Sequence, residues 1–576
     1  MDNRSIARFF NEIAALLEIK GSNPFKIRAY RGAAELMTTA AERIVDLDIA
    51  QLMALPGIGK DLAQKIREIA DTGRCRYHAE LLEEFPPTIL DLLGLQGVGP
   101  KTVAMLYASL QIQSLDDLAA AARSGRLRTL KGMGARKEAS ILKAIEDRQR
   151  SAGRHLMPRA RAVAEAIASH LRAAAPDATI DVVGSLRRGV ETIGDVDLLA
   201  AGTDAGVLDA LTLHPQVERI LGHGDTKASV IVQGGLQIDV RLVPLESRGA
   251  AQQYFTGSKD HNIALRDRAT QRGFKLNEYG LFRLDDGSQV AGDAEDAIYA
   301  ALGLVPIPAE LRENRGEIDA AARNELPRLL ERRDLRGDLH THTTATDGRD
   351  SIEAMALAAR AAGLRYLAIT DHSKALAMAN GLDEQRALAH AAAIRRVGER
   401  LDGITLLAGI ECDIGVDGTL DLADDCLAQL DIVVASVHSR LTLEAAAMTD
   451  RVLTALECPY VDILGHPTGR QLLRREPSQM DIDAVLAAAA RHGVALEING
   501  QMHRLDLNDA HARLAHERGV ALIIGSDSHA VSGFGALDWG VTVARRAWLD
   551  KAAVLNTLPL SALRRRLRRH RRARSV

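Results

Sequence analysis

The sequence predicts a multidomain protein of the α+β and α/β classes, with a helical N-terminal region, a mixed α+β middle and a C-terminal distorted (β/α) barrel. Three observations support this prediction. The chain has 576 residues, which is too many for one hydrophobic core. A glycine motif followed by a helical pattern occurs three times in the first 150 residues. From about residue 336, short apolar runs typical of β-strands alternate with alanine-rich helical segments.

The repeated motif has the form L-x-G-h-G, where h is apolar, and begins at Leu55, Leu95 and Leu130. Glycine permits a tight turn, and the helix that follows presents unpaired backbone N–H groups to which a phosphate can bind. One copy could be an ordinary helical hairpin, but three copies in register resemble the helix-hairpin-helix motif. This motif implies a grip on the DNA backbone that is independent of base sequence. The predicted DNA-binding glycines are Gly57, Gly59, Gly97, Gly99, Gly132 and Gly134.

Two aspartates of the middle region, Asp195 and Asp197, flank Val196 in a strand-like run. Alternate side chains of a strand share a face, so both carboxylates are expected to point the same way while Val196 enters the core. Neighbouring carboxylates repel each other unless a cation lies between them, and Mg²⁺ suits such a pair. Asp239, in the run LQIDVRLV, adds a third carboxylate. The three together indicate two Mg²⁺ or Mn²⁺ ions.

The turn Gly184–Ser185 precedes these aspartates, and Arg188 follows the turn. Glycine allows close approach of the backbone, serine provides a hydroxyl donor, and arginine can hold a triphosphate through charge-assisted hydrogen bonds. With the carboxylates, this set indicates nucleotidyl transfer by two-metal catalysis. The D-x-D pattern by itself is common and could be a strand that ends in solvated acids.

The segments GSLRRGVETIGDVD, IDVR and YFTGSKDHNIALRDRATQRGFKLNEYGLF together resemble the family X DNA polymerases of the DNA polymerase beta type. The resemblance implies a nucleotidyltransferase palm, a thumb, and deoxynucleoside triphosphates as substrates. The sequence departs from the animal enzyme at Gln237, Lys259 and Ile263, which affects the expected nucleotide and template contacts. The resemblance assigns catalysis and metal binding to Asp195, Asp197 and Asp239, nucleotide binding to Ser185, Arg188, Gly194, Tyr254, Phe255, Gly257 and Asn262, and a template contact to Arg266.

The segment NPFKIRAYRGAAELM and the first glycine hairpin are similar to the lyase domain of the same family. The resemblance places Lys65 at the position of the Schiff-base lysine and Lys26 at that of a ligand of the DNA 5′-phosphate. A neutral lysine is the nucleophile that this chemistry needs, and a cation such as Lys60 nearby would lower the pKa of Lys65. A lone lysine on a helix is usually solvated, and Phe25 replaces a histidine of the animal enzyme. Whether the chain has 5′-deoxyribose-phosphate lyase activity is therefore left open by the sequence.

Nearly every apolar run of the C-terminal region ends in a side chain that can bind a metal ion. In a β/α barrel these residues converge, because the active site lies at the carboxyl ends of the strands. Imidazole and carboxylate ligands suit Zn²⁺, Mn²⁺ or iron, and their number indicates two or three ions that activate water for attack on phosphorus. A single histidine would more often be structural, so the regular position of the set carries the prediction. The predicted ligands are His340, His342, Asp347, His372, Glu411, His438, His466, Asp527 and His529.

This ligand pattern resembles the polymerase and histidinol phosphatase (PHP) domain. In bacterial family X polymerases a PHP domain implies 3′→5′ exonuclease activity and, in some members, abasic-site endonuclease activity. The expected protein is a bacterial polymerase that fills short gaps during base excision repair or end joining. Two alternatives stay open. One is a PHP phosphoesterase or nuclease, with DNA or a small phosphate ester as substrate, in which the polymerase region only tethers DNA. The other is a non-enzymatic protein that bridges DNA ends.

The net charge of −3 divides unevenly along the chain, with +3 in residues 1–150 and +8 in residues 564–576. Basic ends that suit DNA thus flank an acidic, metal-binding middle. The tail shows no apolar face, so it is expected to be a disordered, solvated segment or to add DNA affinity. The predicted domains are a lyase-like helical domain (1–80), a fingers-like helical domain (81–150), the palm (151–255), the thumb (256–315), a linker (316–335), the PHP domain (336–563) and the basic tail (564–576).

The sequence also predicts where the protein works. Its cysteines, Cys75, Cys412, Cys426 and Cys458, show no C-x-x-C spacing, which indicates reduced thiols. No apolar run approaches the roughly 20 residues needed to span a bilayer, and the polar start MDNRSIARFF is not a signal peptide. A cytoplasmic monomer without membrane contacts is therefore expected, with gapped or nicked double-stranded DNA as its partner.

Overall fold

The computed structural model describes residues 3–39, 44–86, 88–93, 95, 98–130, 132–151 and 153–567. The chain forms two compact units, Met1–Ala152 and Gly153–Val576. None of the helices in the described ranges combines the length and the apolar character that crossing a membrane requires. The structure has Cys75, Cys412, Cys426 and Cys458 as free cysteines.

The first unit is helical throughout its described part. Buried apolar side chains from Ile6 to Ile145 form one hydrophobic cluster, so the helices expected in 1–80 and 81–150 share a core. Each glycine motif leads directly into a helix, and these helices are α4 (Lys60–Thr72), α7 (Pro100–Leu110) and α9 (Ala135–Ser151). The other helices of the unit are α1 (Asn3–Ile19), α2 (Pro24–Thr39), α3 (Ile49–Ala54), α5 (Arg76–Glu83), α6 (Ile89–Leu93) and α8 (Leu115–Arg123).

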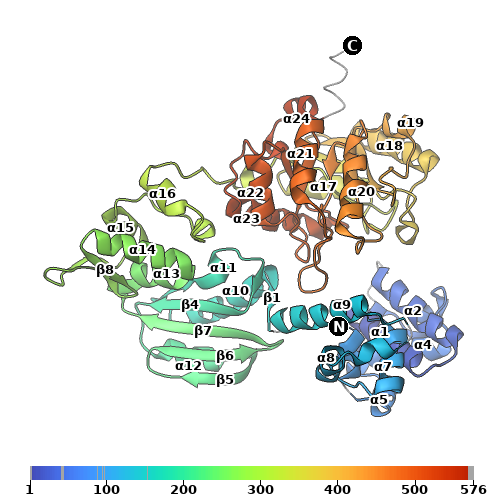
Figure 1. Ribbon diagram of the computed structural model, residues 1–576, viewed down its shortest axis with the longest axis horizontal. Coiled ribbons are helices and arrows are strands. Elements are labelled where there is room, and N and C mark those ends of the chain that lie inside the picture. The colour runs from blue at the N-terminus through green and yellow to red at the C-terminus, as the bar shows by residue number, and fades with distance from the viewer. Residues whose placement is uncertain are drawn as a thin grey trace. The chain divides into compact units, whose positions relative to one another are not determined.

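A five-stranded sheet in the order β2-β4-β7-β6-β5 begins the second unit (Figure 1). Strands β4 and β7 are parallel, and the other neighbours are antiparallel. Val196 and Ile238 are fully buried on the face that packs against α10 (Met157–Ala174) and α12 (Gly206–Thr212). The strands are β2 (Thr179–Val182), β4 (Asp195–Ala201), β5 (Val217–His223), β6 (Lys227–Val232) and β7 (Leu236–Val243), with a separate pair β1 (His155–Leu156) and β3 (Thr192–Ile193).

A smaller α+β layer follows the five-stranded sheet. Its strands form an antiparallel sheet in the order β10-β9-β8, and its helices share with them a core that includes Leu265, Leu281 and Ile298. The elements are α13 (Arg248–Thr256), α14 (Lys259–Gln271), β8 (Phe274–Asn277), β9 (Gly280–Arg283), β10 (Gln289–Ala291) and α15 (Glu295–Ala301).

The segment predicted as a linker, 316–335, is folded against its neighbours. It contains α16 (Glu317–Ala322), and Glu317 is fully buried with its Oε1 2.6 Å from His261 Nδ1. Leu329 and Leu330 are also buried. The segment is therefore no extended tether, because its charged side chain is paired inside the protein and its apolar side chains enter hydrophobic cores.

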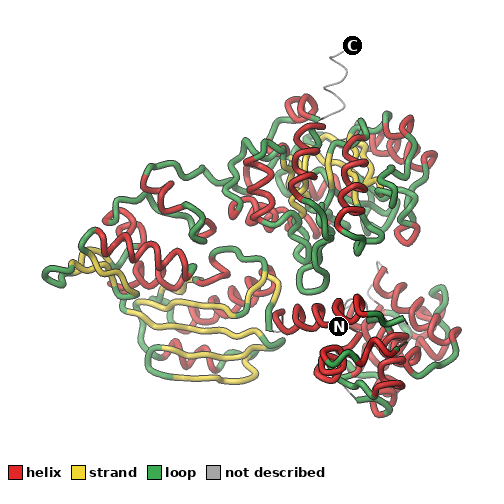
Figure 2. Tube along the Cα trace, viewed as in Figure 1, coloured by secondary structure: helices red, strands yellow, loops and turns green. Residues whose placement is uncertain are grey.

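Seven parallel strands in chain order, β11 to β17, form the third layer. A parallel bridge between Thr341 and Ser528 joins the two ends of this sheet, so the barrel is nearly closed and its strands lie inside a ring of helices (Figure 2). The predicted distorted (β/α) barrel is confirmed. The strands are β11 (Gly337–Asp338), β12 (Tyr366–Ile369), β13 (Thr405–Asp413), β14 (Ile432–Ser436), β15 (Ile463–Leu464), β16 (Ala495–Asn499) and β17 (Leu522–Gly525). The helices are α17 (Ile352–Ala361), α18 (Glu384–Gly398), α19 (Asp424–Leu427), α20 (Ala445–Glu457), α21 (Ile482–His492), α22 (Asp509–Glu517) and α23 (Ala536–Arg546).

The start of the predicted basic tail is part of the barrel. Helix α24 (Leu560–Arg566) buries Leu563, and Leu567 is buried beside it in the cluster that contains Val434 and Ile523. The prediction that residues 564–576 have no apolar face is thus wrong at Leu567, which directly follows α24 and packs into the same hydrophobic cluster as Leu563. Residues 568–576 lie outside the described ranges.

Candidate active sites

Three carboxylates meet at one edge of the five-stranded sheet. Asp195 and Asp197 lie on the same face of β4, and Asp197 is in register with Asp239 on the parallel strand β7. One carboxylate oxygen from each residue lies within 4.8 Å of the other two. The structure thus brings together the three residues that the sequence predicts as ligands of a divalent metal.

The electrostatics of these carboxylates fit a bound cation. Burial, and then the charges of Asp195 and Asp239, raises the pKa of Asp197 from 3.8 to about 6. Burial would also raise the pKa of Asp239, but hydrogen bonds from Lys227 and Gln237 hold it below its usual value. Because oxygen ligands of this kind suit Mg²⁺ and Mn²⁺, the donor set fits the expected metals.

The turn that precedes β4 begins a one-turn helix, α11 (Gly184–Arg187). Gly184 has a φ of +68°, and a Cβ on this residue would overlap Oδ2 of Asp197. The sequence predicts a close backbone approach at this glycine. The structure shows that the approaching group is a carboxylate of the protein itself, so any larger residue would displace Asp197.

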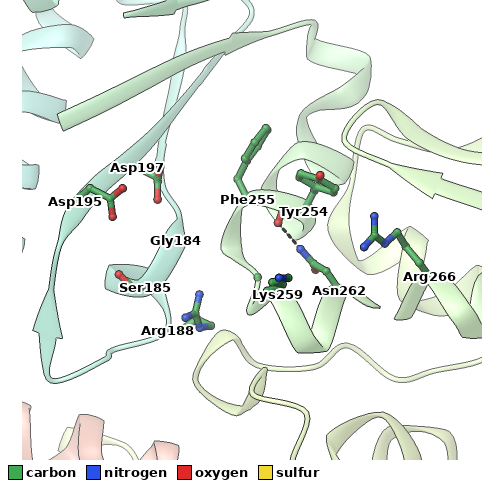
Figure 3. A pocket seen from close by; sticks show the side chains of 11 residues that line it. Gly184, Ser185, Arg188, Asp195, Asp197, Tyr254, Phe255, Lys259, Asn262 and Arg266 are labelled. Carbon is green, nitrogen blue, oxygen red and sulfur yellow. Dashed lines mark hydrogen bonds between the residues drawn. The ribbon is translucent and has the colours of Figure 1, made fainter. Parts of the chain in front are cut away.

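A cavity of about 350 Å³ adjoins the carboxylates. In Figure 3, Asp195, Asp197 and Ser185 lie on one side of it, and Tyr254, Asn262 and Arg266 lie on the other. Of the predicted nucleotide ligands, Gly194 alone is not part of the wall. The residues that line the cavity are Gly184, Ser185, Arg188, Asp195, Asp197, Tyr254, Phe255, Gly257, Lys259, Asn262 and Arg266.

Two polar side chains of this wall are held by hydrogen bonds. Asn262 Nδ2 donates to the carbonyl oxygen of Tyr254 at 2.7 Å, the dashed line in Figure 3, and Asn262 Oδ1 accepts from Gln253 at 2.8 Å. Arg188 Nε lies 3.0 Å from Glu313 Oε1, and its Nη1 donates to the carbonyl oxygen of Thr256 at 2.5 Å. The amide and the guanidinium are therefore oriented before any ligand binds.

A second group of candidate residues lies at the carboxyl ends of the barrel strands. The residues form three sets, and within each set the ligand atoms lie within 4.8 Å of one another. The sets share His342 and His372. His466 joins them through its Nε2, which lies 2.9 Å from Glu411 Oε1. The structure thus gathers all the predicted barrel ligands into one cluster. The sets are His342, Asp347, His372 and His529; His340, His342 and Asp527; and His372, Glu411 and His438.

The surroundings of His340 fit a bound metal. Its Nδ1 lies 2.8 Å from Glu497 Oε1, which assigns the ring proton to Nδ1. Its Nε2 has no hydrogen-bond partner among the described residues, and lies 3.4 Å from Glu411 and 3.8 Å from Asp527. Burial would lower the pKa of His340, but the charges of Glu497, Glu411 and Asp527 hold it well above its ordinary value. The carboxylates thus favour positive charge at Nε2, which a proton or a metal ion can supply, and a carboxylate behind a metal-binding histidine is the usual arrangement.

The histidines of the cluster differ in protonation. Burial, and then the charges of His529 and His372, lowers the pKa of His342 to about 4. Burial would also lower the pKa of His372, but the charge of Glu411 and the hydrogen bond to Asp347 raise it to about 10. Neutral imidazole is the form that binds metals, so His342 is ready to bind and metal binding would displace a proton from His372.

Two polar residues beside this cluster, Glu497 and His390, were not predicted from the sequence, whereas Asp371 directly follows the apolar run YLAIT. Glu497 lies within β16, and besides His340 it accepts a hydrogen bond from the backbone N–H of His466 at 2.6 Å. Asp371 accepts from Thr343 and from His390 Nε2, which fixes the loop that carries Asp347. Glu497 could have been predicted from the run VALEIN, because a carboxylate inside an apolar strand of this barrel needs a polar partner.

The first unit presents its own predicted residues. Gly59 and Gly99 are the residues immediately before α4 and α7, and a Cβ on either would meet no atom within 4 Å, which leaves room for a phosphate. Gly57 and Gly132 have positive φ, as a tight turn requires, and Gly134 is likewise open. Gly97 lies outside the described residues.

The two predicted lyase residues lie close together. Lys26 Nζ is 4.6 Å and Lys65 Nζ 5.1 Å from the centre of the Tyr77 ring, and Lys26 also donates to the Tyr77 hydroxyl. The ammonium of Lys65 is paired with the carboxylate of Asp61. Lys26 and Lys65 thus lie together at the ring of Tyr77, a residue that was not predicted from the sequence.

Family models match the chain in sequence order, and they agree with the resemblances in the sequence. They are a helix-hairpin-helix domain at residues 1–75, a SAM-like helix-hairpin-helix tandem at 89–147, a DNA polymerase beta palm at 157–234, a DNA polymerase beta thumb at 251–313 and a PHP domain at 338–501.

Individual relatives match over the whole chain or a part of it. The DNA polymerase/3′-5′ exonuclease PolX of Bacillus subtilis (strain 168) is 36% identical over 573 residues, which cover 99% of this chain and 100% of the relative. A probable phosphatase of Shewanella sp. (strain MR-4) is 33% identical over 39% of this chain and 89% of its own length. A probable phosphatase of Thermoanaerobacter sp. (strain X514) is 30% identical over 38% of this chain and 89% of its own length.

Proposed function

Because this chain belongs to the family X DNA polymerases that carry a C-terminal PHP domain, we propose that it extends primers at the palm and shortens DNA 3′ ends at the barrel. The full-length likeness to a relative named as a DNA polymerase and 3′-5′ exonuclease supports both activities. One observation carries the polymerase assignment: the parallel register of β4 and β7 places Asp239 beside Asp197. Asp197 in turn lines a cavity whose wall includes all the expected nucleotide ligands except Gly194.

At the palm, Asp195, Asp197 and Asp239 hold two Mg²⁺ or Mn²⁺ ions. When bound, the ions activate the primer 3′-hydroxyl and stabilise the charge of the leaving pyrophosphate. Ser185 and Arg188 donate hydrogen bonds to the triphosphate, which fixes its α-phosphorus near the carboxylates.

The opposite wall of the cavity receives the rest of the nucleotide. Tyr254, Phe255 and Gly257 lie against the sugar, while Asn262 and Arg266 face the base and the template strand. Lys259 adds a positive charge to this wall, which favours an anionic nucleotide or template strand. Gly194 stands before the carboxylate strand and contributes backbone only.

At the barrel, the histidine and carboxylate cluster holds two or three Mn²⁺, Zn²⁺ or iron ions. When bound, the ions supply an activated water for attack on a phosphodiester. His340 and His466 are oriented by Glu497, and Asp347 is kept in place by the loop that Asp371 anchors. The substrate is a DNA 3′ end, and an abasic site is a further substrate of the same chemistry.

The helical unit and the palm hold gapped or nicked double-stranded DNA. The hairpin glycines leave backbone N–H groups accessible to phosphates, and Lys26 binds the 5′-phosphate of a short gap. Lys65 beside Tyr77 is the candidate for a lyase nucleophile. The role that follows is short-gap filling in DNA repair by a cytoplasmic monomer.

Primer extension tests the polymerase assignment. A labelled primer next to a one-nucleotide gap with a 5′-phosphate is incubated with Mg²⁺ and nucleotides. Asp197→Asn is expected to lose extension, whereas Asp225→Asn, a change at an exposed residue of the same sheet region, keeps the wild-type rate. Full extension by Asp197→Asn would show that the carboxylates are not the site.

A second candidate function for the barrel is hydrolysis of a small phosphate ester, because relatives named as probable phosphatases match about two fifths of the chain. p-Nitrophenyl phosphate and a labelled single-stranded DNA separate the two substrates. Hydrolysis of the ester with no shortening of DNA would favour the phosphatase. In both assays His340→Ala should be inactive, and the exposed His516→Ala should be active.

A further inference from the structure

Arg188, the expected triphosphate ligand, is not free in the palm. Its Nε lies 3.0 Å from Glu313 Oε1, and the two side chains are only 14% and 18% exposed. A partly buried ion pair of this kind is weakly screened by solvent, so the carboxylate offsets much of the charge that Arg188 presents to a triphosphate. Figure 3 shows Arg188 between the carboxylate side of the cavity and the Lys259 side.

A residue of the barrel shares the same carboxylate oxygen. Arg546, at the end of α23, places Nη1 3.0 Å from Glu313 Oε1 and donates from the same nitrogen to the carbonyl oxygen of Arg188 at 2.8 Å. Its Nη2 lies 3.0 Å from Asp509 Oδ2, and its side chain is only 6% exposed. One carboxylate therefore lies between two guanidiniums, one from the polymerase site and one from the PHP domain.

The PHP domain holds the same turn at two further points. Gly189 lies so close to Thr542 on α23 that a Cβ on the glycine would overlap the Thr542 methyl group. Glu191 is paired with both terminal nitrogens of Arg470, which follows His466 by four residues. The segment from Arg188 to Glu191 thus connects the nucleotide site to the barrel through polar contacts at Arg188 and Glu191 and through close packing at Gly189.

We propose that Arg546 of the PHP domain is a positioning residue of the polymerase site, which sets the affinity for the incoming nucleotide by sharing Glu313 with Arg188. This inference rests on the proposed polymerase function and deepens it. Arg546 draws the charge of Glu313 away from Arg188 and fixes the backbone of Arg188. The guanidinium of Arg188 is then available to a triphosphate, although Glu313 lies beside it.

Two substitutions at this contact are expected to act in opposite directions. In Arg546→Gln the whole charge of Glu313 acts on Arg188, so the KM for the nucleotide rises about 5-fold or more, the lower end of typical coupling between sites. In Glu313→Gln that charge is removed and Arg188 is released, so the KM falls. The double variant should have a lower KM than Arg546→Gln, since the carboxylate that acts on Arg188 is then absent.

The neighbouring residue Arg545 provides a matched control. It also lies on α23 and also joins the PHP domain to the preceding segment, with Nε 2.7 Å from Glu310 Oε1 and Nη1 donating to the carbonyl oxygen of Leu330. Arg545→Gln therefore removes a comparable ion pair without touching Arg188. A general loosening of this interface would affect both variants alike.

The experiment measures steady-state KM and kcat for one nucleotide on a one-nucleotide gap, with His340→Ala in every variant so that primers are not shortened. The expected result is a raised KM for Arg546→Gln, a lowered KM for Glu313→Gln and an unchanged KM for Arg545→Gln. Equal KM values for Arg546→Gln and Arg545→Gln would overturn the proposal, as would a raised KM for Glu313→Gln.

Two other outcomes, a variant that does not fold and a polymerase site that is inactive, can be told apart from failure of the proposal. If thermal melting shows that Arg546→Gln does not fold, the sign of the Glu313→Gln effect decides alone. If the His340→Ala protein, which is the background of every variant, extends no primer, the polymerase assignment itself is wrong. That result differs from one in which the His340→Ala protein extends primers and Arg546→Gln leaves its KM unchanged, which would contradict only the role of Arg546.

Discussion

Lys227 Nζ lies 2.6 Å from Oδ2 of Asp239, so a cation from β6 holds the third carboxylate of the palm. Gln237, on the same strand as Asp239, donates to the other oxygen at 2.9 Å. Asp239 thus accepts from a charged donor on the neighbouring strand and from a neutral donor on its own strand. This contact orients Asp239 toward Asp197.

Lys227→Met should therefore impair primer extension. A hydrogen bond to a charged group contributes about 1.5–3 kcal/mol, so kcat/KM is expected to fall roughly 10-fold or more. Lys275→Met, at an exposed lysine of β8, is the control and should behave as the wild type. A wild-type rate for Lys227→Met would mean that Gln237 alone orients Asp239.

Gly184→Ala is expected to abolish extension while leaving the PHP activity intact. The new methyl group would occupy the position of Asp197 Oδ2, and the φ of +68° strains any residue with a Cβ. Gly222→Ala in the same sheet is the control, because its Cβ would meet nothing within 4 Å. Rates of extension and of 3′ shortening, measured on one preparation, check the prediction.

The pH dependence of stability should report on Glu295. Burial would raise the pKa of this carboxyl, but the charge of Arg312 and the hydrogen bonds from Arg187 and Arg312 hold it at about 2, below the ordinary 4.5. A lowered pKa means that its stabilisation is full above pH 4.5 and is lost as the pH falls toward 2. The shift corresponds to about 3 kcal/mol.

The measurement is the difference in melting temperature between the wild type and Glu295→Gln at a series of pH values. This difference should be constant from pH 7 to about 5 and should shrink below 4.5. Glu325→Gln, in an exposed ion pair with Arg323, is the control and should show almost no difference at any pH. A wild-type advantage that grows on acidification would contradict the assignment.

Glu497→Gln should weaken the metal cluster of the barrel. Glu497 orients His340 and His466, and loss of such a partner typically costs 10- to 100-fold in metal affinity or activity. Metal retained after dialysis and the rate of 3′ shortening should both fall, while extension stays unchanged. Glu517→Gln, which alters an exposed ion pair with Arg513, should retain its metal. Equal metal content in the two variants would be evidence against the role of Glu497.

Local patterns of the sequence were sufficient to predict most residues of the palm site and of the barrel site. Asp195 and Asp197 could be placed together because strand alternation puts them on one face. The barrel ligands could be predicted because they follow apolar runs of the sequence, and parallel strands of a barrel end at one mouth. Glu497 was missed although, like Glu411, it lies near the carboxyl end of its strand. Lys227 was missed because its partner is on another strand.

Contacts between distant segments could not be predicted in this way. Glu313 and Arg546 are separated by more than two hundred residues, and composition cannot distinguish a paired buried charge from a solvated one. The same reason explains the segment 316–335, whose charged residue Glu317 is paired with His261 inside the protein. It also explains the missed burial of Leu567, which arginines surround in the sequence.

The central claim is that one chain holds two independent active sites. The most direct test is one gel with a labelled primer on a one-nucleotide gap, Mn²⁺, and reactions with and without nucleotides, for wild type, Asp197→Ala and His340→Ala. Asp197→Ala should shorten the primer but never extend it, and His340→Ala should extend it but never shorten it. If either substitution removes both activities, or if the wild type shortens primers and never extends them, the claim of two independent sites is contradicted.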